Sequence, residues 1–179
     1  MANKYDEERS WKYKYRPYIL AAALAIILTM FVAPEIQEGQ AMAPTIDNGS
    51  LVVIMKQHYS QQRGIPKIGT VVILEKDGAT AISKDNLIAR VVGLPGETIE
   101  IKGGKLYRDG KEYIVKGTEG NLGNDLKVKL GTGEVFLVCD NRDLLMDSRS
   151  KKLGPIAMKV IRGNVRFILW PFSEIGGVK

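Results

Sequence analysis

An apolar run near the start of the chain constrains its fold more than any other feature. Residues 18–33 (YILAAALAIILTMFVA) carry no charge and lie between Pro17 and Pro34. The run is at the short end of what crosses a hydrocarbon core about 30 Å thick. A cleaved signal peptide is disfavoured because Pro34 directly follows the best small-residue site. A buried soluble helix would show a polar face, and this run has none. The run therefore predicts a single transmembrane anchor over residues 18–33.

The charges on either side of this run predict its orientation. Basic residues precede it and acidic residues follow it closely. Because basic residues stay on the cytoplasmic side of a membrane, we expect residues 1–17 to form a cytoplasmic N-terminus. Residues 35–179 would then lie outside the cytoplasm, tethered to the cell membrane. The charged residues used here are Lys4, Arg9, Lys12, Lys14 and Arg16 before the run, and Glu35, Glu38 and Asp47 after it.

Short β-rich runs alternate with turn residues through the rest of the chain. Asp109-Gly110 is a strong hairpin signal, residues 156–162 could form a short helix, and residues 116–132 predict a surface loop. Strands this frequent predict a mainly β fold, with an antiparallel β domain behind one N-terminal transmembrane helix. A barrel and a pair of sheets both satisfy this pattern. The predicted strands are residues 51–56, 70–76, 87–93, 97–103, 105–113, 134–140 and 163–172.

Composition and single residues exclude several function classes. The net charge of +6 is spread along the chain rather than gathered in a stripe, so we expect no nucleic-acid partner. Cys139 is the only cysteine and His58 the only histidine, which leaves no internal disulfide and no Cys/His metal cluster. We expect no cofactor. No serine stands in a G-x-S-x-G elbow, which disfavours a Ser-His-Asp triad.

Three stretches together point to one family. They are GQAMAPTIDNGSLVVIMK (39–56), ARVVGLPGE (89–97) and FLVCDNRDLLMDSR (136–149), the last followed by LGPI (153–156). In order and spacing they resemble the three sequence boxes of bacterial type I signal peptidases of the Gram-positive kind. The resemblance covers essentially the whole chain. It implies a membrane-anchored β-fold endopeptidase that removes signal peptides from exported precursors on the outer face of the membrane.

The resemblance also implies a catalytic pair that this chain lacks. In the family, a serine in the first box is the nucleophile and a lysine before the second box is its base. Serine is a weak nucleophile without a base, and lysine acts as one only when it is neutral. Here the serine position is Ala41 and the lysine position is Ala89, which predicts an inactive protein. The supporting or groove positions are Gly39, Met42, Pro44, Arg90, Cys139, Asp140, Leu145, Asp147 and Arg149.

Further departures from the family pattern favour natural decay over an engineered dyad mutant. The family usually has glycine where Cys139 stands, a serine that supports the lysine at Leu145, and aspartate at Ser50. Three groups could replace the lost nucleophile: Ser83 beside Lys84, Ser50 or Cys139. Ser83 and Lys84 are disfavoured because neighbours along a strand point to opposite faces. Ser50 is expected on the surface, and Cys139 is expected to be a small apolar residue of a half-buried strand. An active peptidase with displaced catalytic groups is thus the alternative, and the inactive protein is the favoured interpretation.

Loss of the pair does not by itself remove a peptide groove. An extended signal sequence would be held by backbone hydrogen bonds along strand edges, with small apolar pockets for alternate side chains. The chain is also similar to dyad-lacking signal peptidase-like proteins that assist assembly in surface-pilus systems. Expected partners are the cytoplasmic membrane and either signal-peptide-bearing precursors or pilin-like surface proteins. The boxes could equally serve only to hold the β fold together.

Overall fold

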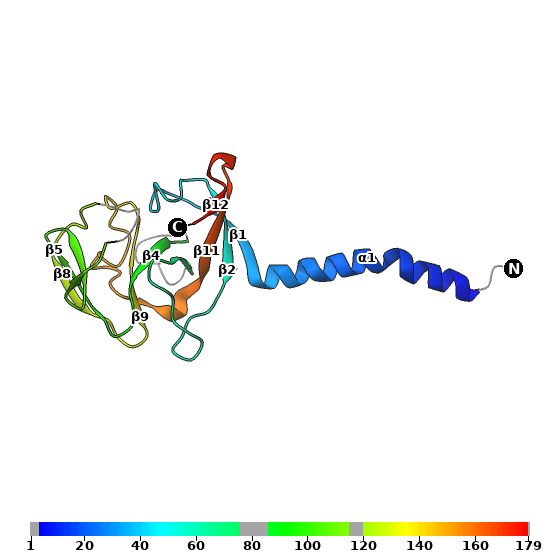
Figure 1. The fold of residues 1–179 in the computed structure, drawn as a ribbon, viewed down its shortest axis with the longest axis horizontal. Helices are drawn as coiled ribbons and strands as arrows, with labels where there is room; N and C mark the ends of the chain where they lie inside the picture. Colours follow the sequence, from blue (N-terminus) through cyan, green and yellow to red (C-terminus); the bar gives the residue numbers. More distant parts are fainter. Residues whose placement is uncertain (1–3, 76–85, 115–119, 179) are drawn as a thin grey trace.

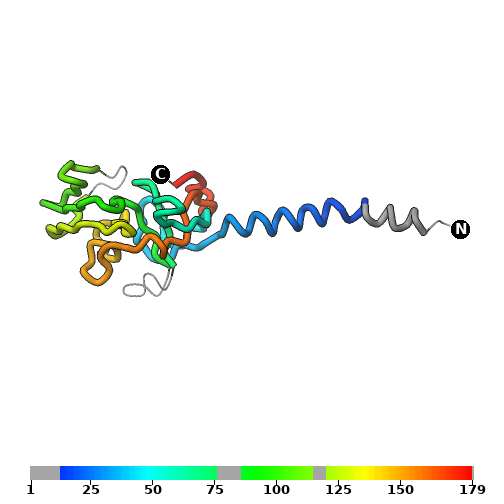
Figure 2. Tube along the Cα trace, turned by 90° about the horizontal axis from the view of Figure 1, so that it is seen from below, coloured from blue at the N-terminus to red at the C-terminus, as the bar shows by residue number. Residues whose placement is uncertain are grey.

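A long N-terminal helix projects away from a domain built of β strands. The computed structural model describes residues 4–75, 86–114 and 120–178. Helix α1 (Lys4–Phe31) leads from the N-terminus to the strands, and its outer end lies far from them (Figures 1 and 2). Its stretch Tyr13–Phe31 is long and apolar enough to cross a membrane, and none of it is buried. This confirms the predicted apolar helix at the N-terminus.

The helix has other bounds than the anchor predicted over residues 18–33. The helix runs through Pro17, and it ends at Phe31 rather than at residue 33. Strand β1 (Val32–Ile36) follows at once and pairs antiparallel with β2 (Leu51–Lys56). The ladder of backbone hydrogen bonds, which the local sequence does not reveal, decides where the helix stops. Pro34 is accommodated because β1 is the last strand of its sheet, where a missing N–H breaks no ladder.

The larger sheet carries most of the core. Its strand order is β1-β2-β11-β3-β4-β9-β10, with β12 paired to β11, and every pairing is antiparallel. Every residue of β3 and β4 is buried, so both strands are covered on both faces. The bounds are β3 (Val71–Leu74), β4 (Ile88–Gly93), β9 (Glu134–Val138), β10 (Ile156–Ala157), β11 (Ile161–Trp170) and β12 (Gly176–Gly177).

A smaller antiparallel sheet packs against the larger one, in the order β7-β6-β5-β8. One buried apolar cluster joins Ile99 and Ile101 of the smaller sheet to Phe136 and Val138 of the larger sheet. Asp109 and Gly110 both have positive φ, at 47° and 79°, which confirms the predicted hairpin. The mainly β fold is thus confirmed as two sheets rather than one barrel. The bounds are β5 (Thr98–Lys102), β6 (Lys105–Arg108), β7 (Lys111–Glu112) and β8 (Leu126–Lys129).

Two local predictions were wrong. Residues 156–162 contain only the single 3-10 turn η2 (Met158–Val160), because β10 occupies Ile156–Ala157 and β11 begins at Ile161. Residues 116–132 were predicted as a loop, yet β8 lies within them and pairs with β5. Val128 on β8 packs at the edge of the apolar cluster between the sheets, so a tertiary contact selects the strand. A second 3-10 turn, η3 (Phe172–Glu174), lies near the C-terminus.

Candidate functional site

The first box forms a tight turn that carries Ala41. Gly39 begins it with a φ of +79°, a conformation that suits glycine, and the Ala43–Pro44 peptide bond within it is cis. The side chains of Met42 and Ile46 are fully buried. The Ile46 N–H donates to the Met42 carbonyl at 3.0 Å, which closes the turn on itself. These contacts anchor the turn and leave Ala41 only 6% exposed.

The third box binds directly to this turn. The Asn141 N–H donates to the Ala41 carbonyl at 3.0 Å. The Asn141 side-chain amide donates to the Gln40 carbonyl, also at 3.0 Å. The Thr45 hydroxyl donates to Asp140 Oδ2 at 2.6 Å. Residues about a hundred positions apart in the sequence are therefore held together at Ala41.

The second box is tied to the third by a buried ion pair. Arg90 Nε donates to Asp140 Oδ1 at 2.9 Å, and Arg90 Nη2 donates to Asp140 Oδ2 at 2.6 Å. Arg90 Nη1 donates to the Gly69 carbonyl at 2.7 Å. Two parallel bonds between a guanidinium and a carboxylate fix both groups in orientation as well as position. Asp140 thus joins all three boxes, because Thr45 also donates to it.

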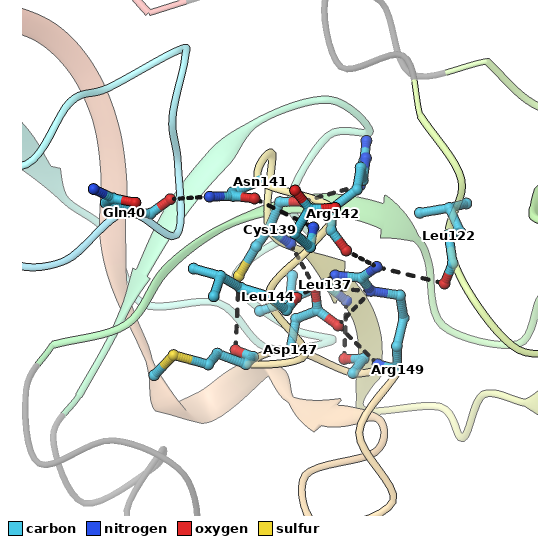
Figure 3. A network of polar contacts seen from close by, with 12 residues as sticks. Gln40, Leu122, Leu137, Cys139, Asn141, Arg142, Leu144, Asp147 and Arg149 are labelled. Atoms are coloured by element: carbon cyan, nitrogen blue, oxygen red, sulfur yellow. Dashed lines mark hydrogen bonds and ion pairs between the residues drawn. The ribbon is translucent and has the colours of Figure 1, made fainter.

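A second buried ion pair shapes the turn after β9 (Figure 3). Arg149 Nη2 lies 2.8 Å from Asp147 Oδ2, and Arg149 also donates to the carbonyls of Leu122, Arg142 and Leu144. Asp147 Oδ2 accepts a further bond from the Cys139 N–H at 2.8 Å. Burial of this pair is tolerated because hydrogen bonds satisfy both groups. Asp147 and Arg149, which the sequence analysis lists as supporting positions, are thus paired with each other.

The two positions where the family has its reacting groups share one buried apolar cluster. Ala41 and Ala89 both belong to it, as does Cys139, and Met146 packs against it. Ala89 lies on β4 opposite Val72 of β3 and is fully buried. Both positions thus lie within one apolar cluster, and each carries a methyl group that can neither attack nor accept a proton.

A cavity of about 110 Å³ lies beside Ala41. Neither Ala89 nor Leu145 lines it. Leu145 is 57% exposed, and its neighbour Met146 faces the cavity instead. The sequence analysis missed Gln37 and Asn86, whose only signal was their position shortly before the first and second boxes. The cavity is lined by Gln37, Glu38, Gly39, Gln40, Ala41, Asn86, Leu87, Ile88 and Met146.

The described residues offer no good substitute for the lost nucleophile. Cys139 is fully buried rather than half-buried. Burial raises the pKa of its thiol well above the ordinary value, and the negative charge of Asp147 raises it further, so the thiol stays protonated. Ser50 is also fully buried, contrary to the expected surface position, because its carbonyl accepts a hydrogen bond from Gln37 N–H at the base of β1 and β2. Ser83 and Lys84 lie outside the described residues. No group of three or more His, Cys, Asp and Glu among the residues described could hold a metal ion.

Comparison with known proteins gives a consistent result. The profile of the family "Signal peptidase, peptidase S26" matches residues 11–170. A signal peptidase I of Bacillus amyloliquefaciens is 33% identical, with 98% of this chain and 97% of the relative aligned. Signal peptidase I T of Bacillus subtilis is 34% identical over 90% of this chain and 86% of its own length. A solved signal peptidase I from Enterococcus faecalis, 20% identical, aligns with 56% of this chain and 97% of its own at a TM-score of 0.48. The profile and the sequence relatives place this chain in the signal peptidase, peptidase S26 family.

Proposed function

We propose that this chain is a membrane-anchored, non-cleaving signal peptidase relative that binds extended segments of exported precursors in the cavity beside Ala41. One observation carries the proposal. Both dyad positions are alanine, whereas the contacts that hold the three boxes around them are intact. A general loss of function would remove the contacts between the three boxes as well as the reacting groups. A protein under selection for binding alone would lose only the reacting groups and keep these contacts.

The absence of cleavage follows from the chemistry of the missing groups. A hydroxyl needs a neighbouring base to attack a peptide bond, and neither is present at Ala41 or Ala89. In serine proteases the rate left after such losses is roughly 10³–10⁴ over water, which is negligible for a peptide bond. Of the three groups that could replace the nucleophile, the side chains of Cys139 and Ser50 are fully buried, and Ser83 lies outside the described residues.

Peptide binding does not require the reacting groups, and the chain still has a cavity that could take part of a peptide. Residues 37–41 and 86–88, which are far apart in the sequence, both line the cavity, so an extended peptide bound there could meet the backbone of either segment. The apolar side chains of Leu87, Ile88 and Met146 complete its wall. Such a site suits one small side chain of an extended ligand. A purely structural role for the boxes is the second reading, and it predicts no ligand at all.

The partner class follows from the family. Relatives are named signal peptidase I, and the apolar helix α1 would hold the domain beside the membrane, where precursors emerge. We therefore propose signal-peptide-bearing precursors as the ligands. Pilin-like surface subunits are a narrower choice within this class, suggested by the resemblance to dyad-lacking accessory proteins of surface-pilus systems.

A binding and cleavage assay on one preparation tests the proposal. The full chain in detergent is mixed with a fluorescently labelled leader peptide, and both anisotropy and peptide length are followed. We expect saturable binding without any shortened product. Ala41→Leu, which fills the cavity, should abolish binding, whereas Gln61→Leu on an exposed turn should not. Shortened product would restore the active-peptidase alternative, and the absence of binding would favour the structural reading.

A further inference from the structure

Two amide side chains in the cavity wall hold hydrogen-bond acceptors that nothing satisfies. Gln37 Oε1 and Asn86 Oδ1 are buried and have no hydrogen-bond partner within the part of the chain that the structure describes. Both residues line the cavity beside Ala41, and Gln37 is only 2% exposed. A buried acceptor without a partner costs free energy, so two such acceptors on residues that line one cavity call for an explanation.

The surrounding contacts fix the direction of both amides. Gln37 Nε2 donates to the carbonyls of Glu38 and Gly39, at 3.0 and 3.4 Å. A carbonyl cannot donate, so an amide turned the other way would lose these bonds. Asn86 Nδ2 donates to a carboxylate oxygen of Glu35, which imposes the same constraint. The donor end of each amide is therefore engaged with the protein, and the acceptor end is left over.

The rest of the wall has the opposite character. Leu87, Ile88, Met146 and the methyl group of Ala41 contribute apolar surface. The volume of about 110 Å³ is smaller than the 150 Å³ or so of a cavity that holds benzene, so the site suits a small side chain. A ligand that fits both parts of the wall has few carbon atoms and a hydroxyl that donates a hydrogen bond.

We propose that the cavity beside Ala41 selects a serine or threonine side chain of the bound peptide over an alanine or valine side chain. The hydroxyl donates to Gln37 Oε1 or Asn86 Oδ1, and the carbon atoms lie against the apolar wall. An apolar side chain in the same place would leave both oxygens unsatisfied. Sites built to hydrogen-bond a ligand group discriminate strongly against the analogue that lacks it. This inference rests on the proposed function, because it names the side chain that the same peptide site takes.

Matched peptides test the inference on the full-length protein in detergent. The probe is a labelled leader peptide with an alanine-rich C-terminal half, compared with twins in which each alanine in turn becomes serine. We expect one serine twin to bind about tenfold more tightly than the alanine parent. Gln37→Met and Asn86→Leu each remove one acceptor at similar volume, and at least one of them should bring the ratio of the serine twin's affinity to the parent's affinity down to about one. Gln61→Met, on an exposed turn, is the control and should keep the preference.

The outcomes separate this inference from the function on which it rests. If all peptides bind equally to the natural protein, water satisfies the two oxygens and the inference is wrong, although peptide binding stands. If no peptide binds, the proposed function fails and the inference fails with it. If either variant does not fold, the other variant and the comparison of twins on the natural protein still decide the question. A serine preference that survives in both variants would also overturn the assignment to Gln37 and Asn86.

Discussion

Arg90 and Asp140 form a two-bond ion pair in which the arginine side chain is 4% exposed and the aspartate side chain is fully buried. The pair joins β4 to the turn that follows β9. The same carboxylate accepts the Thr45 hydroxyl of the first box. Because Asp140 satisfies groups from two other segments, its side chain helps to fix the relative positions of the turn at Ala41, the strand that carries Ala89 and the third box, together with the hydrogen bonds of Asn141.

We expect Asp140→Ala to lower the free energy of unfolding by about 3–5 kcal/mol, since it leaves the Arg90 guanidinium buried without its counter-ion. Urea unfolding of the full chain, followed by intrinsic fluorescence, measures this change. Glu112→Ala is the matched control, because it breaks the exposed ion pair with Lys105 and should have no measurable effect. Equal effects of the two substitutions would show that the buried pair does not hold the boxes together.

The buried thiol of Cys139 predicts a dependence of stability on pH. Its pKa is raised in the folded state by burial first and by the charge of Asp147 second, whereas an unfolded thiol has a pKa of about 8.5. Above about pH 8.5 the unfolded chain loses the proton and the folded chain keeps it, so the stability present below this pH is lost progressively as pH rises.

We therefore expect the free energy of unfolding to fall more steeply between about pH 8 and pH 10 in the natural protein than in Cys139→Ala. Urea titrations across this range on both proteins measure the two slopes. Tyr59, whose pKa burial also raises, titrates in both proteins and cancels from the difference. Parallel curves would contradict the raised thiol pKa and would reopen Cys139 as a reactive group.

The sequence predicts best those features that a few neighbouring residues decide. The turn at Asp109 and Gly110 could be predicted because two adjacent residues tolerate positive φ. The end of α1 could not, since it depends on the pairing of Val32 with Met55. Strand β8 was missed for the same reason, because packing between the sheets, not local composition, selects it.

The candidate site also has some features that can be recognised in the sequence and others that cannot. The boxes could be recognised from their order and spacing, and the structure joins Arg90 to Asp140 and the neighbouring Asn141 to Ala41. Which side chains line the cavity could not be predicted, because Gln37 and Asn86 meet there only when β1 and β4 take their places. The burial of Ser50 was missed for a related reason, since a serine beside a glycine has the local character of a surface turn.

The charge distribution predicts that residues 35–179 lie outside the cytoplasm and that the anchor is not cleaved. We expect external protease to destroy a C-terminal tag on intact protoplasts while sparing a short N-terminal fragment. Immunoblotting of the tag and of an N-terminal epitope measures both ends of the same chain. A cytoplasmic marker protein that stays intact is the control for lysis. Protection of the whole chain would contradict the predicted orientation.

Restoring the two reacting groups tests whether the loss is confined to them. Ala41→Ser with Ala89→Lys supplies a nucleophile and a base, but position 89 is fully buried and its amine must be both neutral and oriented. Burial favours the neutral form of lysine. Orientation needs a hydrogen-bond partner. Leu145 is exposed and does not face the site, whereas Met146 packs against the cluster that contains Ala89 and offers no hydrogen bond that would hold the amine.

We expect the double variant to cleave leader peptide feebly and the triple variant with Met146→Ser to cleave it several-fold faster or more. A reacting group displaced by about 1 Å loses on the order of 10²-fold in rate, so an unsupported lysine should be a poor base. The assay compares both variants on one fluorogenic leader peptide at equal concentration, after circular dichroism shows that both fold. The matched control is the double variant with Leu145→Ser, which adds a hydroxyl one position away on an exposed side chain and should give no gain. A double variant as fast as a working signal peptidase would mean that only the dyad was lost, as in an engineered mutant. An inert triple variant that still binds leader peptide would place further decay elsewhere in the site and leave the binding function intact.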